Sequence, residues 1–271
     1  KCTRTFFYRF LKNVLTRSKF SLEYPLEKGP IFHMTNNKVA SNCSECILAK
    51  KCVPSGMPAE KLFRFENIVQ TNILYKTGNA LFEQRVKTNY LYIVKTGSFK
   101  TKMISPHGTE HVHNFFLPGE VIGLDSVGFG MTLNSAEALE PSLACKIDYP
   151  SLRMLRKEFP TLSDFSVKLY SNALASMSLV QNIISLQAAS SRLAAFLLLY
   201  QSRLSSPQLQ TTSFQLPMTR QDIASHLGLA IETVSRSFSK LIDTGCILKE
   251  GRNIQILDNK KLEQRANTST R

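Results

Sequence analysis

The chain has 271 residues, 43% of them hydrophobic, which suits one large or two ordinary globular domains. The formal net charge of +14 favours polyanionic partners, but residues 1–42 hold eight Lys or Arg against two Glu, so charge alone identifies no nucleic-acid surface. No apolar run approaches the ~18 residues that a membrane span needs, so we expect no membrane-spanning segment.

We interpret residues 1–42 as a basic N-terminal arm. The apolar run at 6–11 is too short, and too broken by Arg9, to be a secretory signal. Two interpretations stay open: residues 1–33 are upstream sequence read through before a natural start at Met34, or the arm is native and disordered. Six cysteines without a signal peptide indicate a reducing, cytoplasmic compartment, where clustered cysteines suggest metal or redox chemistry more than disulfides.

Short apolar runs cut by turn signals extend from residue 63 to residue 149. We expect strands at 80–82, 90–94, 98–103 and 145–147, and turns at 76–79, 95–97, 105–108 and 117–120. Glycines supply the positive φ angles that such turns need. Strands at this spacing predict an antiparallel sandwich or barrel, and we assign residues 43–160 to one sensor domain.

After residue 160 the hydrophobic period changes to that of a helix, which we place at 161–187. Apolar residues and one Gln recur in alternating steps of three and four and form a heptad seam: Val167, Tyr170, Leu174, Met177, Gln181 and Ile184. The seam fits one face of a helix that packs on its own core, or the contact of a parallel dimer. We favour the dimer, because the helix lacks Pro and Gly and is longer than its sandwich needs.

A second helix is expected at 188–202, and residues 218–241 have the layout of a helix-turn-helix. Thr219 is placed to cap the first helix, with Asp222 three residues later as its acidic partner. Gly228 falls in the turn, and four apolar positions form the buried stripe: Leu227, Val234, Phe238 and Leu241. Residues 245–256 predict a hairpin, so we expect a winged helix-turn-helix at 188–258 and a disordered tail at 259–271.

The second helix of this motif exposes Glu232, Ser235 and Arg236 on one side, at positions i, i+3 and i+4. A helix in the major groove reads bases with its N-terminal residues. Arg can bridge guanine O6 and N7, and Glu can accept from cytosine N4. Three further residues are candidates for phosphate contacts, which position a protein without specifying a sequence: Thr219, Arg220 and Thr233.

Four cysteines form a candidate metal site. Cys43, Cys46 and Cys52 lie in one short loop, and Cys145 lies on an expected strand. Four thiolates suit either an iron–sulfur cluster or zinc, and spacing alone does not separate the two. We interpret Cys2 and Cys246 as non-ligands.

The order of a β-rich sensor, a long helix and a winged helix-turn-helix resembles the Crp/Fnr family of bacterial transcription regulators, over about residues 43–258. The turn at 117–123 (LPGEVIG) and the E-x-x-S-R pattern that ends at Arg236 carry the resemblance. It implies an α+β fold: a Cys-rich loop, an antiparallel β-roll, a dimerisation helix and a C-terminal winged helix-turn-helix. The recognition helix and the cysteine spacing are similar to the Fnr branch.

That branch implies one [4Fe–4S] cluster per subunit, held by Cys43, Cys46, Cys52 and Cys145, with oxygen as the signal. It implies a homodimer when the cluster is intact, and TTGAT-type inverted repeats in double-stranded DNA read by Glu232, Ser235 and Arg236. Global control of anaerobic-metabolism genes and contact with RNA polymerase follow from the same likeness. The alternative is a regulator of this family whose four cysteines hold structural zinc and which answers another signal.

Two other classes of function are disfavoured. Family relatives that bind cyclic nucleotides hold the phosphate with an Arg-Ser pair, and here Asn134 precedes Ser135, so no cation would neutralise a buried phosphate. An enzyme is suggested only by the histidines around Gly108, namely His107, His111 and His113. No carboxylate constellation or nucleophile motif accompanies them, so we expect no catalytic activity.

Overall fold

The computed structural model describes residues 42–49, 52–204 and 211–267. The basic arm up to residue 41, and with it the question of a start at Met34, lies outside these residues. The chain divides into two compact units, one ending at Ser178 and the other beginning at Leu179, and each is described by itself.

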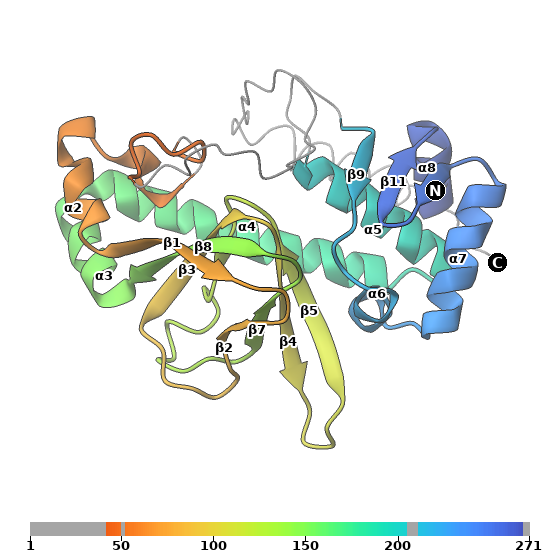
Figure 1. The fold of residues 1–271 in the computed structure, drawn as a ribbon, viewed down its shortest axis with the longest axis horizontal. Helices are drawn as coiled ribbons and strands as arrows, with labels where there is room; N and C mark the ends of the chain where they lie inside the picture. Colours follow the sequence, from red (N-terminus) through yellow and green to blue (C-terminus); the bar gives the residue numbers. More distant parts are fainter. Residues whose placement is uncertain (1–41, 50–51, 205–210, 268–271) are drawn as a thin grey trace, which may run out of the picture. The chain divides into compact units, whose positions relative to one another are not determined.

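The first unit is a β-roll of two antiparallel sheets (Figure 1), as the strand spacing predicts. One sheet has the order β1-β8-β3-β6 and the other β2-β7-β4-β5. The strands are β1 (Val69–Tyr75), β2 (Ala80–Phe82), β3 (Tyr90–Thr96), β4 (Phe99–Ile104), β5 (Glu110–Phe116), β6 (Val121–Ile122), β7 (Ser135–Ala138) and β8 (Ser142–Asp148). All four expected strands are present.

Two cores flank the first sheet, because strand residues alternate between its faces. Tyr92 and Val94 of β3 pack toward β4 and β7. Leu91 and Ile93 pack on the opposite side, in a core cluster that also holds residues of the Cys-rich loop and of the helices. The candidate metal site lies on this second side.

Short helices lead into the β-roll and longer ones leave it. η1 (Val53–Gly56), η2 (Ala59–Lys61) and α2 (Leu62–Glu66) precede β1, and α3 (Tyr149–Glu158) and α4 (Pro160–Ile184) follow β8. The Asp148 carboxylate caps α3 by accepting a hydrogen bond from the Ser151 backbone N–H at 2.9 Å. The long helix expected at 161–187 is α4, which has 25 residues.

The second unit is a winged helix-turn-helix. It contains α5 (Ala189–Leu204), α6 (Arg220–Leu227), α7 (Ile231–Asp243), α8 (Asn259–Ala266) and a sheet of order β10-β11-β9, formed by β9 (Ser213–Gln215), β10 (Ile247–Glu250) and β11 (Asn253–Ile256). The expected capping box is present: Thr219 and Asp222 bond each other's backbone N–H at the start of α6. Gly228 ends α6 with a φ of +62°, which a glycine adopts without strain.

The expectation of a disordered tail at 259–271 is wrong for most of its length, because residues Asn259–Ala266 form α8. The Asp258 carboxylate accepts a hydrogen bond from the Lys261 backbone N–H at 2.9 Å and caps the helix. Leu262 and Ala266, one turn apart, are buried. Two apolar residues among many charged ones are a weak helix signal in a sequence. They are enough to hold α8 in place once they pack against α5. Residues 268–271 lie outside the described chain.

Within the described residues, none of the helices is both long and apolar enough to cross a bilayer.

Candidate metal centre and nucleic-acid interface

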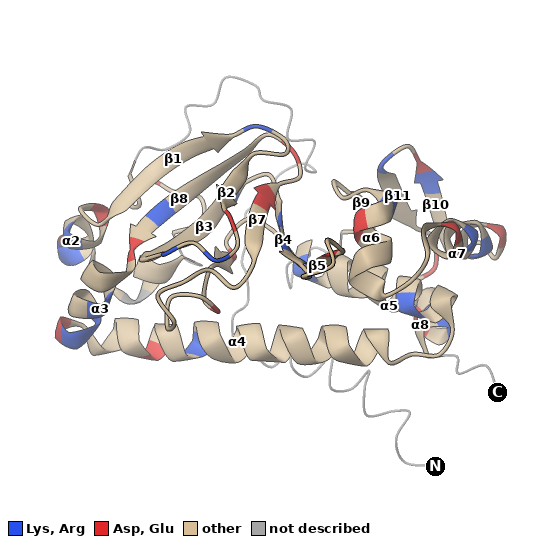
Figure 2. Cartoon of the chain, turned by 90° about the horizontal axis from the view of Figure 1, so that it is seen from below, with Lys and Arg blue, Asp and Glu red and all other residues tan. Residues whose placement is uncertain are grey.

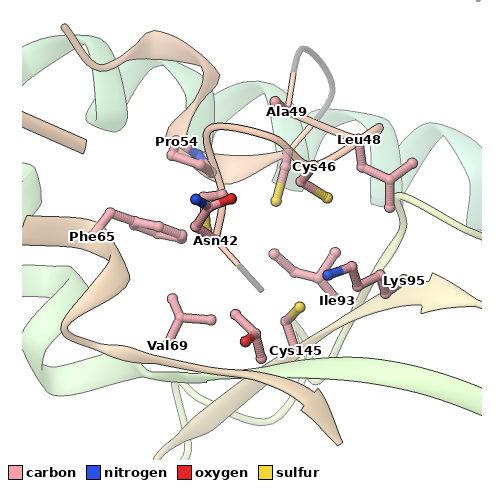
Figure 3. Close-up of a pocket in the computed structure, with 13 residues that line it drawn as sticks. Asn42, Cys46, Leu48, Ala49, Pro54, Phe65, Val69, Ile93, Lys95 and Cys145 are labelled. Carbon is pink, nitrogen blue, oxygen red and sulfur yellow. The ribbon is translucent and has the colours of Figure 1, made fainter. Parts of the chain in front are cut away.

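The four candidate ligands line one pocket (Figure 3), although Cys145 is far from the other three in the sequence. Cys145 is on β8, whereas the other three precede η1 in the chain, and Figure 3 shows Cys46 and Cys145 on opposite sides of the pocket. The remaining lining is mostly apolar and includes Leu48, Phe65, Val69 and Ile93. A mostly apolar wall limits access of water, which matters for an oxidisable group.

The loop that carries Cys43, Cys46 and Cys52 packs against the β-roll through its own side chains and backbone. Leu48 and Val53 are almost completely buried. The Cys43 backbone N–H donates to Glu66 Oε1 of α2 at 2.7 Å. These contacts hold the loop, and with it the three thiols, against the β-roll.

Burial disfavours the charged form of these thiols. It raises the pKa of Cys43 to about 12, with the Glu66 carboxylate as the next cause. It also raises the pKa values of Cys52 and Cys145, and the nearby thiols add to both shifts. A metal must displace these protons to bind, because thiolate is the ligand form.

The thiols surround a space and do not converge on a point. No three His, Cys, Asp or Glu side chains in the described ranges lie close enough together to hold one ion. Sulfurs around a single zinc lie within about 4 Å of one another, because each Zn–S bond is about 2.3 Å long.

The three candidate base-reading residues lie together on the exposed side of α7. Glu232, Ser235 and Arg236 are all exposed in its first turns. Arg236 Nη2 donates to Thr233 Oγ1 at 3.3 Å, which orients the guanidinium along the helix. The buried stripe is on the other side, at Val234, Phe238 and Leu241, so the expected division of the helix into two faces is present.

Two candidate phosphate contacts also have structural roles within the unit. Thr219 Oγ1 donates to Asp222 Oδ2 at 2.6 Å as part of the capping box. The Arg220 guanidinium lies over the Phe238 ring, 3.3 Å from its centroid, and burial lowers its pKa. Arg220 thus joins α6 to α7 through a cation–π contact, which sequence reasoning did not anticipate.

Sequence reasoning missed Lys95, which lines the same pocket as the four thiols. The signal was present in part: side chains alternate along a strand, so Lys95 and Ile93 share a face of β3. Only the pairing of β3 with β8, which sets Ile93 opposite Cys145, shows that this face meets the thiols.

Comparison with known proteins identifies both units. Residues 73–159 match a model described as a cyclic nucleotide-binding domain, and residues 191–265 match a Crp-like helix-turn-helix domain. The chain is 33% identical over 225 residues to the transcriptional regulatory protein btr of Bordetella pertussis, an alignment that spans 83% of this chain and 93% of that protein. It is 30% identical to the fumarate and nitrate reduction regulatory protein of Escherichia coli over 240 residues, 89% of this chain and 96% of the relative.

The chain belongs to the Crp/Fnr family of transcription regulators. It is also 32% identical to the transcriptional activator protein anr of Pseudomonas aeruginosa over 222 residues, which is 82% of this chain and 91% of that protein. Among solved structures, that of FixK2 from Bradyrhizobium japonicum shares the fold, with a TM-score of 0.67 and 24% identity over 75% of this chain and the whole of the other. As a Crp/Fnr protein, the chain is a DNA-binding regulator and not an enzyme.

Proposed function

We propose that this Crp/Fnr protein senses oxygen in the bacterial cytoplasm through one [4Fe–4S] cluster per subunit, held by Cys43, Cys46, Cys52 and Cys145. With the cluster intact it forms a homodimer, binds TTGAT-type inverted repeats and controls anaerobic-metabolism genes through contact with RNA polymerase. The main support is the pocket itself, where thiols from the loop and from β8 surround one apolar space. A bound cluster would supply an oxygen-labile link between loop and β-roll.

The packing of the loop supports a connection to the dimerisation helix. Cys43 and Val53 belong to the same core cluster as Leu162 and Phe165 of α4. Loss of the metal would loosen the loop side of this core, because metal binding energy is also ordering energy. The start of α4 would then lose packing partners.

The exposed seam of α4 supports a homodimer. Three apolar seam residues are well exposed in the single chain: Val167 at 61%, Leu174 at 65% and Met177 at 60%. Ile184 and Gln181 are exposed as well, and Tyr170 is half-buried. Only Asp164 and Lys168 are charged in this helix (Figure 2). A second copy of α4 would cover this stripe, and two subunits are needed to read an inverted repeat.

The interior of the β-roll supports the absence of cyclic-nucleotide binding. Asn134 is buried and its Nδ2 donates to Asp125 Oδ2 at 2.7 Å. Ser135 Oγ donates to Glu83 Oε2 at 3.0 Å and accepts from the Gln84 backbone N–H at 2.9 Å. These two residues stand where relatives place an Arg-Ser pair; here they bond to the protein itself, beside two carboxylates that would repel a phosphate.

One experiment distinguishes a structural zinc site from an iron–sulfur cluster. We expect protein purified without oxygen to contain about four iron and about four sulfide per chain, and to absorb visible light through sulfur-to-iron charge transfer. Exposure to air should bleach this absorption and convert dimers to monomers in gel filtration. A colourless protein with about one zinc per chain, indifferent to air, would select the zinc regulator.

The base-reading role of Arg236 predicts a sequence-dependent loss of affinity. Arg236→Ala removes one bidentate contact per half-site, each worth about 1–3 kcal/mol, so binding of an inverted repeat should weaken at least 30-fold, by about 2 kcal/mol or more. Binding to a random duplex should change little. Fluorescence anisotropy with both duplexes measures the ratio of the affinity for the inverted repeat to the affinity for the random duplex.

Lys260→Ala is the matched control, because it removes an exposed positive charge from α8 of the same unit. It should leave the ratio of specific to random binding unchanged. An equal loss on both duplexes in Arg236→Ala would mean that Arg236 contacts phosphate only.

A further inference from the structure

A bulge in β1 places Asn72 against Cys145. The register between β1 and β8 shifts between Gln70 and Ile73. Within this interval Asn72 adopts a left-handed backbone with a φ of +58°, a conformation that Asn tolerates better than most residues. Bulges often re-aim groups beside functional sites. Burial raises the pKa of Cys145, and a hydrogen bond from the Asn72 backbone N–H partly offsets that rise.

The side chain of Asn72 holds Lys95 at the same place. Lys95 is on β3 and only 6% exposed. Its Nζ donates to Asn72 Oδ1 at 2.6 Å. Figure 3 shows the amine end of Lys95 directed into the pocket, near Ile93. This hydrogen bond orients the ammonium group beside the pocket.

A positive charge at this position has a clear electrostatic use. Four thiolates around a divalent ion, or around a cluster core of the same charge, leave about two negative charges on the centre. Such charge is costly in an apolar pocket unless a cation is near. Lys95 lines the same pocket as the four thiols, so its ammonium group is placed to supply that cation.

We propose that Lys95, oriented by Asn72, is a positioning residue that offsets the negative charge of the four-thiolate centre and keeps Cys145 bound to it. The inference rests on the proposed four-cysteine centre but applies to either metal, because both leave excess negative charge. Lys95 acts through the ligands.

Three variants and one control test the role of Lys95. Lys95→Met removes the charge and keeps an apolar stem of similar length, whereas Lys95→Arg keeps the charge. Lys146→Met is the matched control: Lys146 follows Cys145 directly on β8, but its Nζ lies over the Tyr90 ring, 3.8 Å from the centroid, and it does not line the pocket. Asn72→Gly keeps the backbone N–H, tolerates the positive φ, and removes the oxygen that accepts from Lys95 Nζ.

The measurement is the anaerobic rate at which a competing chelator extracts the metal from purified holoprotein. We expect Lys95→Met to lose metal about 10-fold faster than wild type, as changes beside metal ligands commonly do. The extraction rate of Asn72→Gly should lie between those of wild type and Lys95→Met. The rates of Lys95→Arg and Lys146→Met should stay within about twofold of wild type. If iron is bound, Lys95→Met should also lower its reduction potential, which a purely structural defect would not do selectively.

Equal extraction rates in wild type and Lys95→Met would overturn the inference, as would equal effects of Lys95→Met and Lys146→Met. A wild type that carries zinc refutes the iron–sulfur proposal alone, because the same comparison then runs on zinc. A wild type that binds neither metal refutes both proposals. Thermal unfolding of each metal-free variant shows whether the fold is intact. If Lys95→Met is unstable, Asn72→Gly still tests the inference, because a wild-type extraction rate in that variant would overturn it.

Discussion

Replacing Cys145 with serine should abolish the proposed oxygen-responsive centre. Cys145→Ser removes one of four thiolates, and the loss of a ligand should exceed the 10- to 100-fold cost of changes beside ligands. We expect the anaerobically purified variant to hold less than about a tenth of the wild-type iron and to bind its operator about 100-fold more weakly. Iron analysis and anaerobic anisotropy on the operator measure the two effects.

Cys246→Ser is the control for this substitution. Cys246 is also a free cysteine, but it is buried in the winged helix-turn-helix unit. Its Sγ lies 3.4 Å from Thr244 Oγ1, which can form a hydrogen bond with a serine hydroxyl at the same position. This variant should keep wild-type iron and air sensitivity. If Cys145→Ser also kept both, Cys145 would not be a ligand and the proposed centre would be wrong.

A charge in the seam of α4 should break the dimer. In Leu174→Glu, two carboxylates would face each other across the twofold axis, and each subunit would lose a buried leucine worth about 1.5–3 kcal/mol. We expect the dimer dissociation constant to rise more than about 100-fold, which corresponds to about 3 kcal/mol or more. Analytical ultracentrifugation of the anaerobic protein measures the dimer dissociation constant, and iron analysis of the same samples measures how much metal each variant holds.

Asn172→Glu places the same charge on the same helix, but on its outer side. Asn172 is exposed and two residues from the seam position, so dimerisation should be unchanged. Iron content should match wild type in both variants, because the ligands are untouched. A dimeric Leu174→Glu variant would show that the seam contacts something other than a second copy.

The two substitutions distinguish the role of the metal centre from that of the dimer. Cys145→Ser removes the centre and thereby the dimer, whereas Leu174→Glu removes the dimer and leaves the centre. Both should lose operator binding, but only the second should remain brown and bleach in air. This pattern is expected if the centre acts on DNA binding through association of subunits.

Much of this protein follows from local pattern. Alternating strands, the period of α4, and the cap and turn glycine of α6 are signals carried by neighbouring residues, and each element formed where the pattern places it. The thiol spacing and the exposed face of α7 are equally local. Such features depend on backbone preferences and on periods of 2 and 3.6, which a sequence displays directly.

Other features required the tertiary structure. The helix α8 forms because a neighbouring helix buries Leu262 and Ala266, although its own sequence is mostly charged. The Asn72–Lys95 pair depends on a bulge and on the order of strands in a sheet, since 23 residues separate the two. Local pattern was enough to predict the four thiols and the base-reading residues, but not Lys95. Only packing between distant segments decided which of them meet, because burial and charge act through space and not along the chain.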